Sequence, residues 1–346
     1  MTCLDSTHML PLAKKTGDAE NVDKLYSIVQ KALSRRSFLA GAGTVAATTL
    51  VAGCGNDGGA SMTTTPVAPV VPAGITDVDI LNFALNLEYL EAEFYLRAAT
   101  GSGLGAADIG SSPGTVVGGA KVMGLSTANQ NILNEIAYDE QQHVRFLRSA
   151  LGSAAVSRPN LDITNSFNAL ASAAGIGSSF NPYLNFDTFL VGAFIFEDVG
   201  VTAYHGAAPL ISNAGITAGY LAAAAGIMAV EAYHAAYVRT SLTRNATQQG
   251  STAYPYLGYA NQVATLRATV GGGNETQLTI PSGTTSATTN ATPSAIVAAD
   301  TTNAIAFSRT TDQVLHIVYG TGGAAGVASG GFFPNGMNGN IKTTES

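Results

Sequence analysis

Two segments of this 346-residue chain carry the same pattern, a glutamate and a histidine three residues apart within a predicted helix. The first pair is Glu140 and His143, in ILNEIAYDEQQHVRFLRSAL, and the second is Glu231 and His234, in IMAVEAYHAAYVRTSL. In the first segment the apolar residues recur at the three- and four-residue intervals of one helix face, and the Glu and His interrupt that face. A charge on the buried side of a helix is costly unless it is paired or bound to a metal ion. The repeated pattern therefore predicts two helices that turn metal-ligating groups toward a core.

Two further predicted helices each carry a glutamate that is followed seven residues later by a tyrosine. These pairs are Glu88 with Tyr95 and Glu197 with Tyr204. Seven residues are about two helical turns, so each Tyr is expected on the same face as its Glu. The order along the chain is Glu…Tyr, Glu-x-x-His, Glu…Tyr, Glu-x-x-His. Such an internal repeat of helix pairs predicts a four-helix bundle with pseudo-two-fold symmetry.

Apolar periodicity and capping residues predict where the four helices begin and end. They are expected at about 77–99, 126–152, 187–206 and 217–242. The predicted fold is all-α: a four-helix bundle at 75–244 with long loops, and a C-terminal accessory region at 245–346 that packs on it. A Gly-rich loop is expected at 101–119, and the Gly-flanked Phe332 to Pro334 is expected to form an ordered turn against the bundle.

Six side chains of the four helices can serve together as metal ligands. They are Glu88, Glu140, His143, Glu197, Glu231 and His234. Four carboxylates balance the charge of two divalent ions, and neutral imidazoles complete the ligand set. One Glu from each of two helices and a Glu-x-x-His from each of the other two is the ligand set of ferritin-like di-metal carboxylate proteins. The sequence thus predicts a buried site for two iron or manganese ions, the metals that suit these ligands in redox chemistry.

The ligand from the first helix has a competitor in Glu91, one turn beyond Glu88. The seven-residue spacing to Tyr, which matches the third helix, favours Glu88. Glu91 or Glu93 would then lie around the site or in solvent.

Other residues near the predicted site leave alternatives open. Tyr95 and Tyr204 are the candidate catalytic residues, which would hydrogen-bond the carboxylates or take part in electron transfer, but a merely buried Tyr with a satisfied hydroxyl fits equally well. Asp139 can orient a ligand from outside the site. His205 follows Tyr204 and points about 100° away from it, and His316 is expected to be structural.

Composition and cysteine usage exclude several kinds of protein. The net charge of −7 argues against nucleic acid as a partner. The chain is 46% hydrophobic and 11% charged, so it can bury a substantial core. Its two cysteines, Cys3 and Cys54, lie outside the predicted helices, which excludes a thiolate metal site and a disulfide framework.

The N-terminal residues 1–54 have the features of an export signal. Arg35 and Arg36 precede an apolar run rich in Gly and Ala, as in a twin-arginine signal, and the run is short for a membrane span. The run ends in VAGC, which resembles a bacterial lipoprotein box and would place a lipid anchor at Cys54. The alternatives to a lipoprotein signal are an uncleaved membrane anchor and an ordinary soluble signal. Residues 55–74 read as a flexible linker. We therefore expect a protein of the periplasm or cell envelope.

Four runs of the helical region resemble the ferritin-like domain of the desiccation-related proteins. They are NFALNLEYLEAEFY, AYDEQQHVRFL, FEDVGVTAYHGAAPL and AVEAYHAAYVR, and all lie within about 75–242. Two C-terminal runs, FSRTTDQVLHIVYG and GGFFPNGMNG, resemble the same family more weakly. The resemblance implies a four-helix bundle, metal binding, and a role in oxidative or desiccation stress. Two functions follow as hypotheses: a di-metal oxidoreductase that acts on O2 or peroxide, or a non-enzymatic envelope stress protein. The long loops and the extra C-terminal hundred residues differ from true ferritins, which argues against assembly into a 24-subunit cage. Other oligomeric states are compatible with the sequence.

Overall fold

The structure is a computed structural model that describes residues 74–250, 252–279, 296–300 and 302–345. All of these residues belong to one compact unit. The predicted export signal, with Arg35, Arg36 and Cys54, lies outside the described residues, as does the predicted linker up to residue 73.

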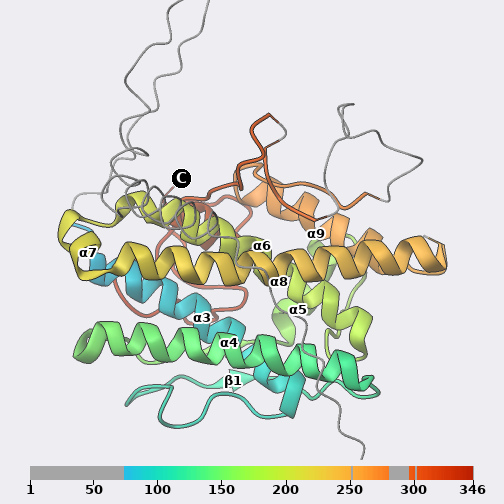
Figure 1. Cartoon of the computed structure of the whole chain (residues 1–346), viewed down its shortest axis with the longest axis horizontal. Coiled ribbons are helices and arrows are strands. Elements are labelled where there is room, and N and C mark those ends of the chain that lie inside the picture. Colours follow the sequence, from blue (N-terminus) through green and yellow to red (C-terminus); the bar gives the residue numbers. More distant parts are fainter. Residues whose placement is uncertain (1–73, 251, 280–295, 301, 346) are drawn as a thin grey trace, which may run out of the picture. The chain divides into compact units, whose positions relative to one another are not determined.

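Four long helices form a bundle: α3 (Asp77–Thr100), α4 (Thr127–Leu151), α6 (Phe186–Ala207) and α8 (Tyr220–Gln249). α3 packs along α4, and α6 packs along α8, while α3 also contacts α6. Figure 1 shows α4 and α8 running along the long axis of the view, with α3 and α6 inclined to them. The predicted all-α four-helix bundle is thus confirmed, and its two helix pairs correspond to the two halves of the sequence repeat.

Capping residues define the ends of these helices. Thr76 and Asp79 form a reciprocal capping box at the start of α3, and the Ser126 side chain caps α4 as predicted. Asn185 caps α6 by accepting from a backbone N–H of its first turn. α3 ends at Gly101, whose φ of +89° is a left-handed conformation that glycine adopts without strain.

The fourth helix differs from its prediction at both ends. A short helix, α7 (Asn213–Ala218), comes first, and the chain then turns at Gly219, whose φ is +91°. α8 continues to Gln249, seven residues beyond the predicted end at Leu242. The extension has a physical reason, because Ala246 lies one turn after Leu242 and both are fully buried, so the apolar face continues.

The long Gly-rich loop at 101–119 contains a short strand that was not predicted. This strand, β1 (Val116–Val117), pairs in parallel with β2 (Leu161–Asp162), with Val116 opposite Leu161. A partner 45 residues away cannot be read from local periodicity. Single-turn 3-10 helices follow α4 and α6, at η1 (Gly152–Ala154) and η2 (Ala208–Leu210).

Three shorter helices cover one flank of the bundle: α5 (Asn165–Ala173), α9 (Tyr256–Val270) and α10 (Thr311–Tyr319). α9 and α10 both pack on α6, and α5 packs on α9. The turn predicted at Phe332 is also present. Its ring lies 5.2 Å from that of Phe167 and 5.0 Å from that of Phe196, measured between ring centres. Described parts of the C-terminal region therefore pack directly on the bundle.

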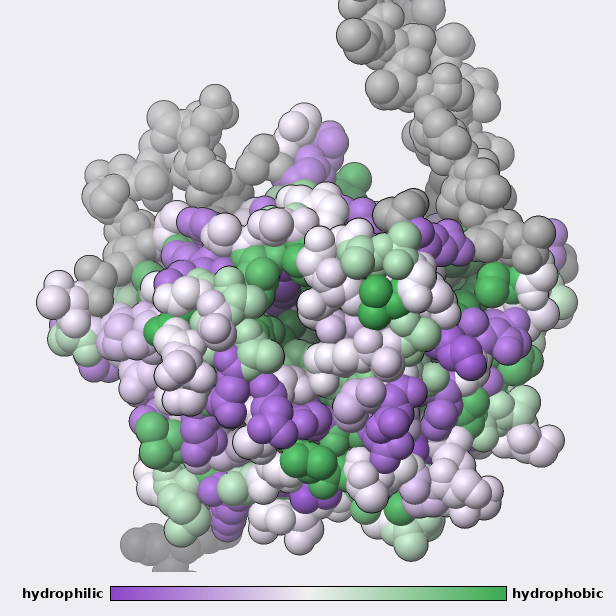
Figure 2. Space-filling view, turned by 180° about the vertical axis from the view of Figure 1, so that it is seen from behind, coloured by the Kyte–Doolittle hydropathy of each residue, from purple (hydrophilic) through white to green (hydrophobic). Residues whose placement is uncertain are grey.

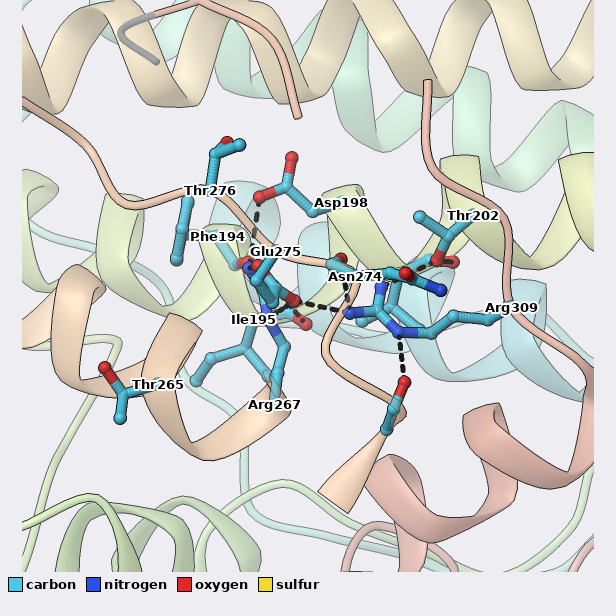
Figure 3. A network of polar contacts seen from close by, with 12 residues as sticks. Phe194, Ile195, Asp198, Thr202, Thr265, Arg267, Asn274, Glu275, Thr276 and Arg309 are labelled. Carbon is cyan, nitrogen blue, oxygen red and sulfur yellow. Dashed lines mark hydrogen bonds and ion pairs between the residues drawn. The ribbon is translucent and has the colours of Figure 1, made fainter. Parts of the chain in front are cut away.

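A buried ionic network ties this region to α6 (Figure 3). Asp198 accepts from Arg239 at 2.8 Å and from Arg267 at 3.1 Å. Glu275 pairs with Arg267 at 2.8 Å and with Arg309 at 2.7 Å, and Figure 3 shows Glu275 between these two arginines. All three arginines are at most 2% exposed. Removing one partner of a buried ion pair typically costs about 3–5 kcal/mol because it leaves an uncompensated charge, so each member of this network depends on the others.

The surface of the unit mixes hydrophobic and hydrophilic residues. The face in Figure 2 shows both kinds interspersed, with a hollow near its centre where hydrophobic residues lie. Among the described helices, α8 is long and apolar enough to cross a membrane by length and composition alone. Its Glu231, His234 and Arg239 side chains are buried within the unit, while 28% of its most apolar 18-residue stretch is buried.

Candidate metal centre

The six candidate ligands meet in the interior of the four-helix bundle. They come from α3 (Glu88), α4 (Glu140 and His143), α6 (Glu197) and α8 (Glu231 and His234). The four glutamates are at most 1% exposed, and the histidines are 7% and 6% exposed. The side chains form two groups that can each hold a cation: Glu88, Glu140, His143 and Glu231 in one, and Glu140, Glu197 and His234 in the other. Within each group the ligand atoms lie within 4.8 Å of one another.

Glu140 belongs to both groups and offers one oxygen to each. Its Oε2 lies 3.3 Å from Nδ1 of His143, and its Oε1 lies 3.0 Å from Nδ1 of His234. A carboxylate that faces two cation sites with separate oxygens has the geometry of a bridge. The arrangement therefore suits two ions side by side.

The remaining contacts repeat across the pseudo-two-fold axis. Nδ1 of His143 lies 3.2 Å from Oε2 of Glu88 and 3.5 Å from Oε1 of Glu231. Nδ1 of His234 lies 3.6 Å from Oε2 of Glu197. Ligand atoms that share one metal ion, each about 2.1 Å from it, are typically about 3 Å apart. These separations therefore fit atoms around common ions.

Several of these buried atoms have no hydrogen-bond partner among the described residues. They are Oε1 of Glu140, Oε2 of Glu197, both carboxylate oxygens of Glu231, and Nδ1 of His234. A buried polar atom without a partner is costly, and the great majority in folded proteins have one. All five atoms face the same interior, so a pair of cations would satisfy them together. The residues fit the ions that the sequence predicts.

Each tyrosine of the sequence repeat reaches across to the opposite half. The hydroxyl of Tyr95 on α3 donates to Glu197 on α6, and the hydroxyl of Tyr204 on α6 donates to Glu88 on α3. Burial and the adjacent carboxylates raise the pKa of both tyrosines well above 10, so both stay protonated donors. On the outer side, Oδ2 of Asp139 lies 3.3 Å from Nε2 of His234, where it can fix the orientation of the imidazole.

Glu88, rather than Glu91, takes part in the two ligand groups. Glu91 is nevertheless buried beside the site and is not solvated. A Cβ atom built on Gly200 would lie 2.4 Å from Oε2 of Glu231 and 3.4 Å from Oε1 of Glu91, so both carboxyl groups approach this glycine. Gly200 thus leaves the room that a fifth carboxyl group needs beside the ligand set.

The other candidates lie outside the two groups. Glu93 was expected around the site or in solvent, but it is fully buried and paired with Arg97 and Arg158. The four-residue spacing to Arg97 is a local sign of an ion pair, but the second partner, Arg158, lies 65 residues away and leaves no local sign. His205 contacts a backbone carbonyl of the C-terminal region, and His316 contacts polar groups of its own segment.

Burial and mutual repulsion govern the charge state of the cluster. Burial raises the pKa of Glu88 to about 7, and it also raises the pKa of Glu91, Glu197 and Glu231. Glu140 is the exception, because the close approach of His143 and His234 outweighs burial and lowers its pKa to about 2. Burial alone would lower the pKa of His234, but the neighbouring carboxylates raise it to about 12. Without cations, the cluster therefore holds protons that metal ions would displace.

Comparison with known proteins agrees with this geometry. The family description "ferritin-like domain" matches residues 76–244, the span of the bundle. The chain is 31% identical to the ferritin-like catalase Nec2 of Nesocodon mauritianus, over 77% of this chain and 84% of that protein. The chain belongs to the ferritin-like family. It is also 32% identical to the desiccation-related protein PCC13-62 of Craterostigma plantagineum, over 57% of this chain and 63% of that protein. The resemblance predicted from the four helical runs is confirmed.

Removing the shared carboxylate is expected to empty both cation sites. Glu140→Ala should lose both ions, because Glu140 belongs to both groups, whereas Glu197→Ala should lose one. Elemental analysis by mass spectrometry of purified protein should find about two iron or manganese ions per wild-type chain. Glu135→Ala, at an exposed position of the same helix, is the matched control and should keep both. Trace metal in the wild type would contradict the two-metal assignment.

The metal-free protein is expected to lose stability as the pH rises from 5 to 8. The pKa of Glu88 is raised from 4.5 to about 7, so the folded state binds this proton more tightly than the unfolded state does. Stability then falls as the pH rises through this window. The raised pKa of His234 acts in the same direction above pH 6.5, while Glu140 is ionised in both states throughout.

Thermal melting followed by circular dichroism at constant ionic strength measures this effect. The melting temperature of metal-free protein should be lower at pH 8 than at pH 5. With added Mn(II) the melting temperature should be higher at pH 8 than at pH 5, because the ion binds the deprotonated ligands. Glu88→Gln should weaken the pH dependence. A metal-free protein that becomes more stable with rising pH would show that these groups are not protonated as described.

Proposed function

We propose that this protein is an exported two-metal enzyme that disproportionates hydrogen peroxide. The observation that carries the proposal is Glu140, which offers one oxygen to each of two adjacent cation sites. In the reaction, two H2O2 give two H2O and one O2. One peroxide is reduced and the other is oxidised, so no further reductant is needed. The relative named ferritin-like catalase supports this choice among the reactions of two-metal sites.

Bound iron or manganese ions would supply the two-electron redox couple for the reaction. The chain's own residues hold and orient the site. Glu140 spans the two positions, and Glu88, Glu197, Glu231 and the two histidines complete them. The hydroxyls of Tyr95 and Tyr204 fix the carboxylates of Glu197 and Glu88 from the opposite half of the bundle, so a shift of one half is transmitted to the other.

Two protons must pass from the oxidised peroxide to the reduced one in each cycle. Glu91 joins neither ligand group, and its carboxyl group approaches the same glycine as that of Glu231. It is therefore placed to take up and return a proton beside the reacting molecules. Hydrogen-bond reach and a carboxyl group free of metal are the two requirements for such a role.

The setting of this activity is the cell envelope under oxidative or drying stress. Paired Arg35 and Arg36 before an apolar run support twin-arginine export, a route that carries folded and metal-loaded cargo, and VAGC supports lipidation at Cys54. The relative named desiccation-related protein supports the stress role. Replacing both arginines by lysine is expected to retain the protein in the cytoplasm. Cell fractionation measures this, and periplasmic protein in the double variant would refute twin-arginine export.

An oxygen electrode tests the activity directly. Wild-type protein loaded with manganese or iron should release one O2 for every two H2O2 consumed, and Glu140→Ala should release none. Tyr95→Phe and Tyr204→Phe should each lower turnover or metal affinity about 10–100-fold, the usual cost of losing a group that orients a ligand. Tyr138→Phe, at a 60% exposed position, is the control and should behave as wild type.

The alternative is a stress protein that uses the bundle structurally. It predicts a different pattern in the same variants: lower melting temperature on loss of the ligands, but no O2 release even from fully loaded wild type. That result would overturn the enzymatic proposal.

A further inference from the structure

Two cavities that share part of their lining lie on the α10 side of the candidate metal centre. The inner cavity, of about 20 Å³, is bounded by α3, α6, α10 and Phe332. The outer cavity, of about 230 Å³, is bounded by α5, α9, α10 and the same phenylalanine. Three side chains border both cavities, namely Ile317, Val318 and Phe332. They form a thin wall between the two spaces.

The inner cavity ends beside the candidate metal centre. Gly200 and Glu91 both line it, and the Cβ position of Gly200 is 2.4 Å from Oε2 of Glu231. A side chain at position 200 would clash with Glu231. Glycine there lets the carboxylate of this candidate ligand lie against the residues that line the cavity.

The outer cavity ends at solvent. Exposed residues at its rim include Ala169 and Ala173 of α5 and Gly320 after α10. The wall side chain Phe332 is held by its backbone N–H, which donates to the carbonyl of Val318 at 2.9 Å. This close approach needs Gly331, because a Cβ there would lie 2.4 Å from the same carbonyl.

The lining of the inner cavity selects against polar molecules, whereas the outer cavity also has Ser166 and Arg267 in its lining. Apart from Glu91 at its inner end, the inner cavity is lined by aliphatic and aromatic side chains and glycine. A water molecule needs two to four polar partners to occupy a buried site, and a hydrogen-bonding molecule loses its solvation in such a space. Dioxygen has no hydrogen bonds to lose, so it enters apolar space readily.

The opposite side of the candidate metal centre has a different character. There α4 and α8 meet over few residues, and they carry the two histidines, whose side chains are 9% and 7% exposed. Asp139, 31% exposed, contacts His234 at this side. The partly exposed Asp139 and the two buried histidines present polar groups on this side, which suit a molecule such as H2O2 that donates and accepts hydrogen bonds.

We propose that the two cavities are the exit route of dioxygen, with Ile317, Val318 and Phe332 as its gate, while peroxide enters between α4 and α8. The proposal rests on the proposed function, in which O2 is the product of each cycle. It assigns a role to the C-terminal region, which supplies the gate. Separate routes for an apolar product and a polar substrate keep each from blocking the other.

Xenon, an apolar atom that binds in dry protein cavities, tests the route without metal. Crystals of the metal-free full chain under xenon pressure should show xenon in the outer cavity and, beyond the wall, in the inner cavity. Val318→Phe should remove xenon from the inner side, and Val318→Ala should raise its occupancy. Val314→Ala is the matched control, because Val314 lies one turn earlier on α10, is fully buried, and borders neither cavity.

The metal-loaded variants give the second readout. Val318→Phe should lower the kcat of O2 release about tenfold and lower the KM for peroxide in proportion, because a slower product release leaves kcat/KM unchanged. Val314→Ala should leave both constants unchanged. If Val318→Phe does not fold, Val318→Ala decides the matter through its xenon occupancy and a kcat at or above that of wild type.

The outcomes separate the two proposals. No xenon in either wild-type cavity, or unchanged O2 release from a Val318→Phe protein that has lost xenon, would overturn the route and leave the proposed function standing. Loaded wild type that releases no O2 would overturn the proposed function, whatever the xenon result.

Discussion

Five carboxyl groups share the interior of four helices, and their mutual repulsion is the constraint around which the rest of the structure is arranged. Glu88, Glu91, Glu140, Glu197 and Glu231 are all at most 4% exposed. No ordinary bundle core tolerates this density of like charge, because desolvation and repulsion act together. Only Glu140, which contacts both histidines, has a lowered pKa. The other four need either protons or cations, so the interior can hold cations in place of protons.

Hydrogen bonds and ion pairs around this cluster hold the carboxylates together against their mutual repulsion. Each half of the bundle holds a carboxylate of the other half through a tyrosine hydroxyl, Tyr95 to Glu197 and Tyr204 to Glu88. Asp198, directly after Glu197, is fixed in turn by two buried arginines. Metal-site geometry depends on such supporting groups, since a ligand that is free to rotate loses affinity for its ion. The C-terminal region, through Arg267 and Arg309, thus contributes to the rigidity of α6.

The two sides of the carboxylate cluster differ in polarity, and this difference bears on the chemistry of the site. Histidines, Asp139 and partial exposure mark the side between α4 and α8. Aliphatic and aromatic side chains mark the side toward α10. A reaction with a polar substrate and an apolar product can use both sides, whereas a purely structural bundle has no need for cavities that reach its charged centre.

Local patterns in the sequence were sufficient to determine the four helices, the candidate ligand residues and the choice of a ferritin-like bundle. The reason is that Glu-x-x-His spacing, apolar periodicity and capping residues act within a few turns of one helix. Even the preference for Glu88 over Glu91 followed from a seven-residue spacing. The structure places Glu88, and not Glu91, in the ligand groups.

Tertiary structure alone decided how these elements meet. Tyr95 contacts a glutamate 102 residues away rather than the one on its own helix, and Glu93 is buried by an arginine 65 residues away. The pairing of β1 with β2 and the wall formed by Phe332 also depend on distant partners. Such contacts are set by packing and by the pairing of buried charges, which involve residues that no local pattern brings together.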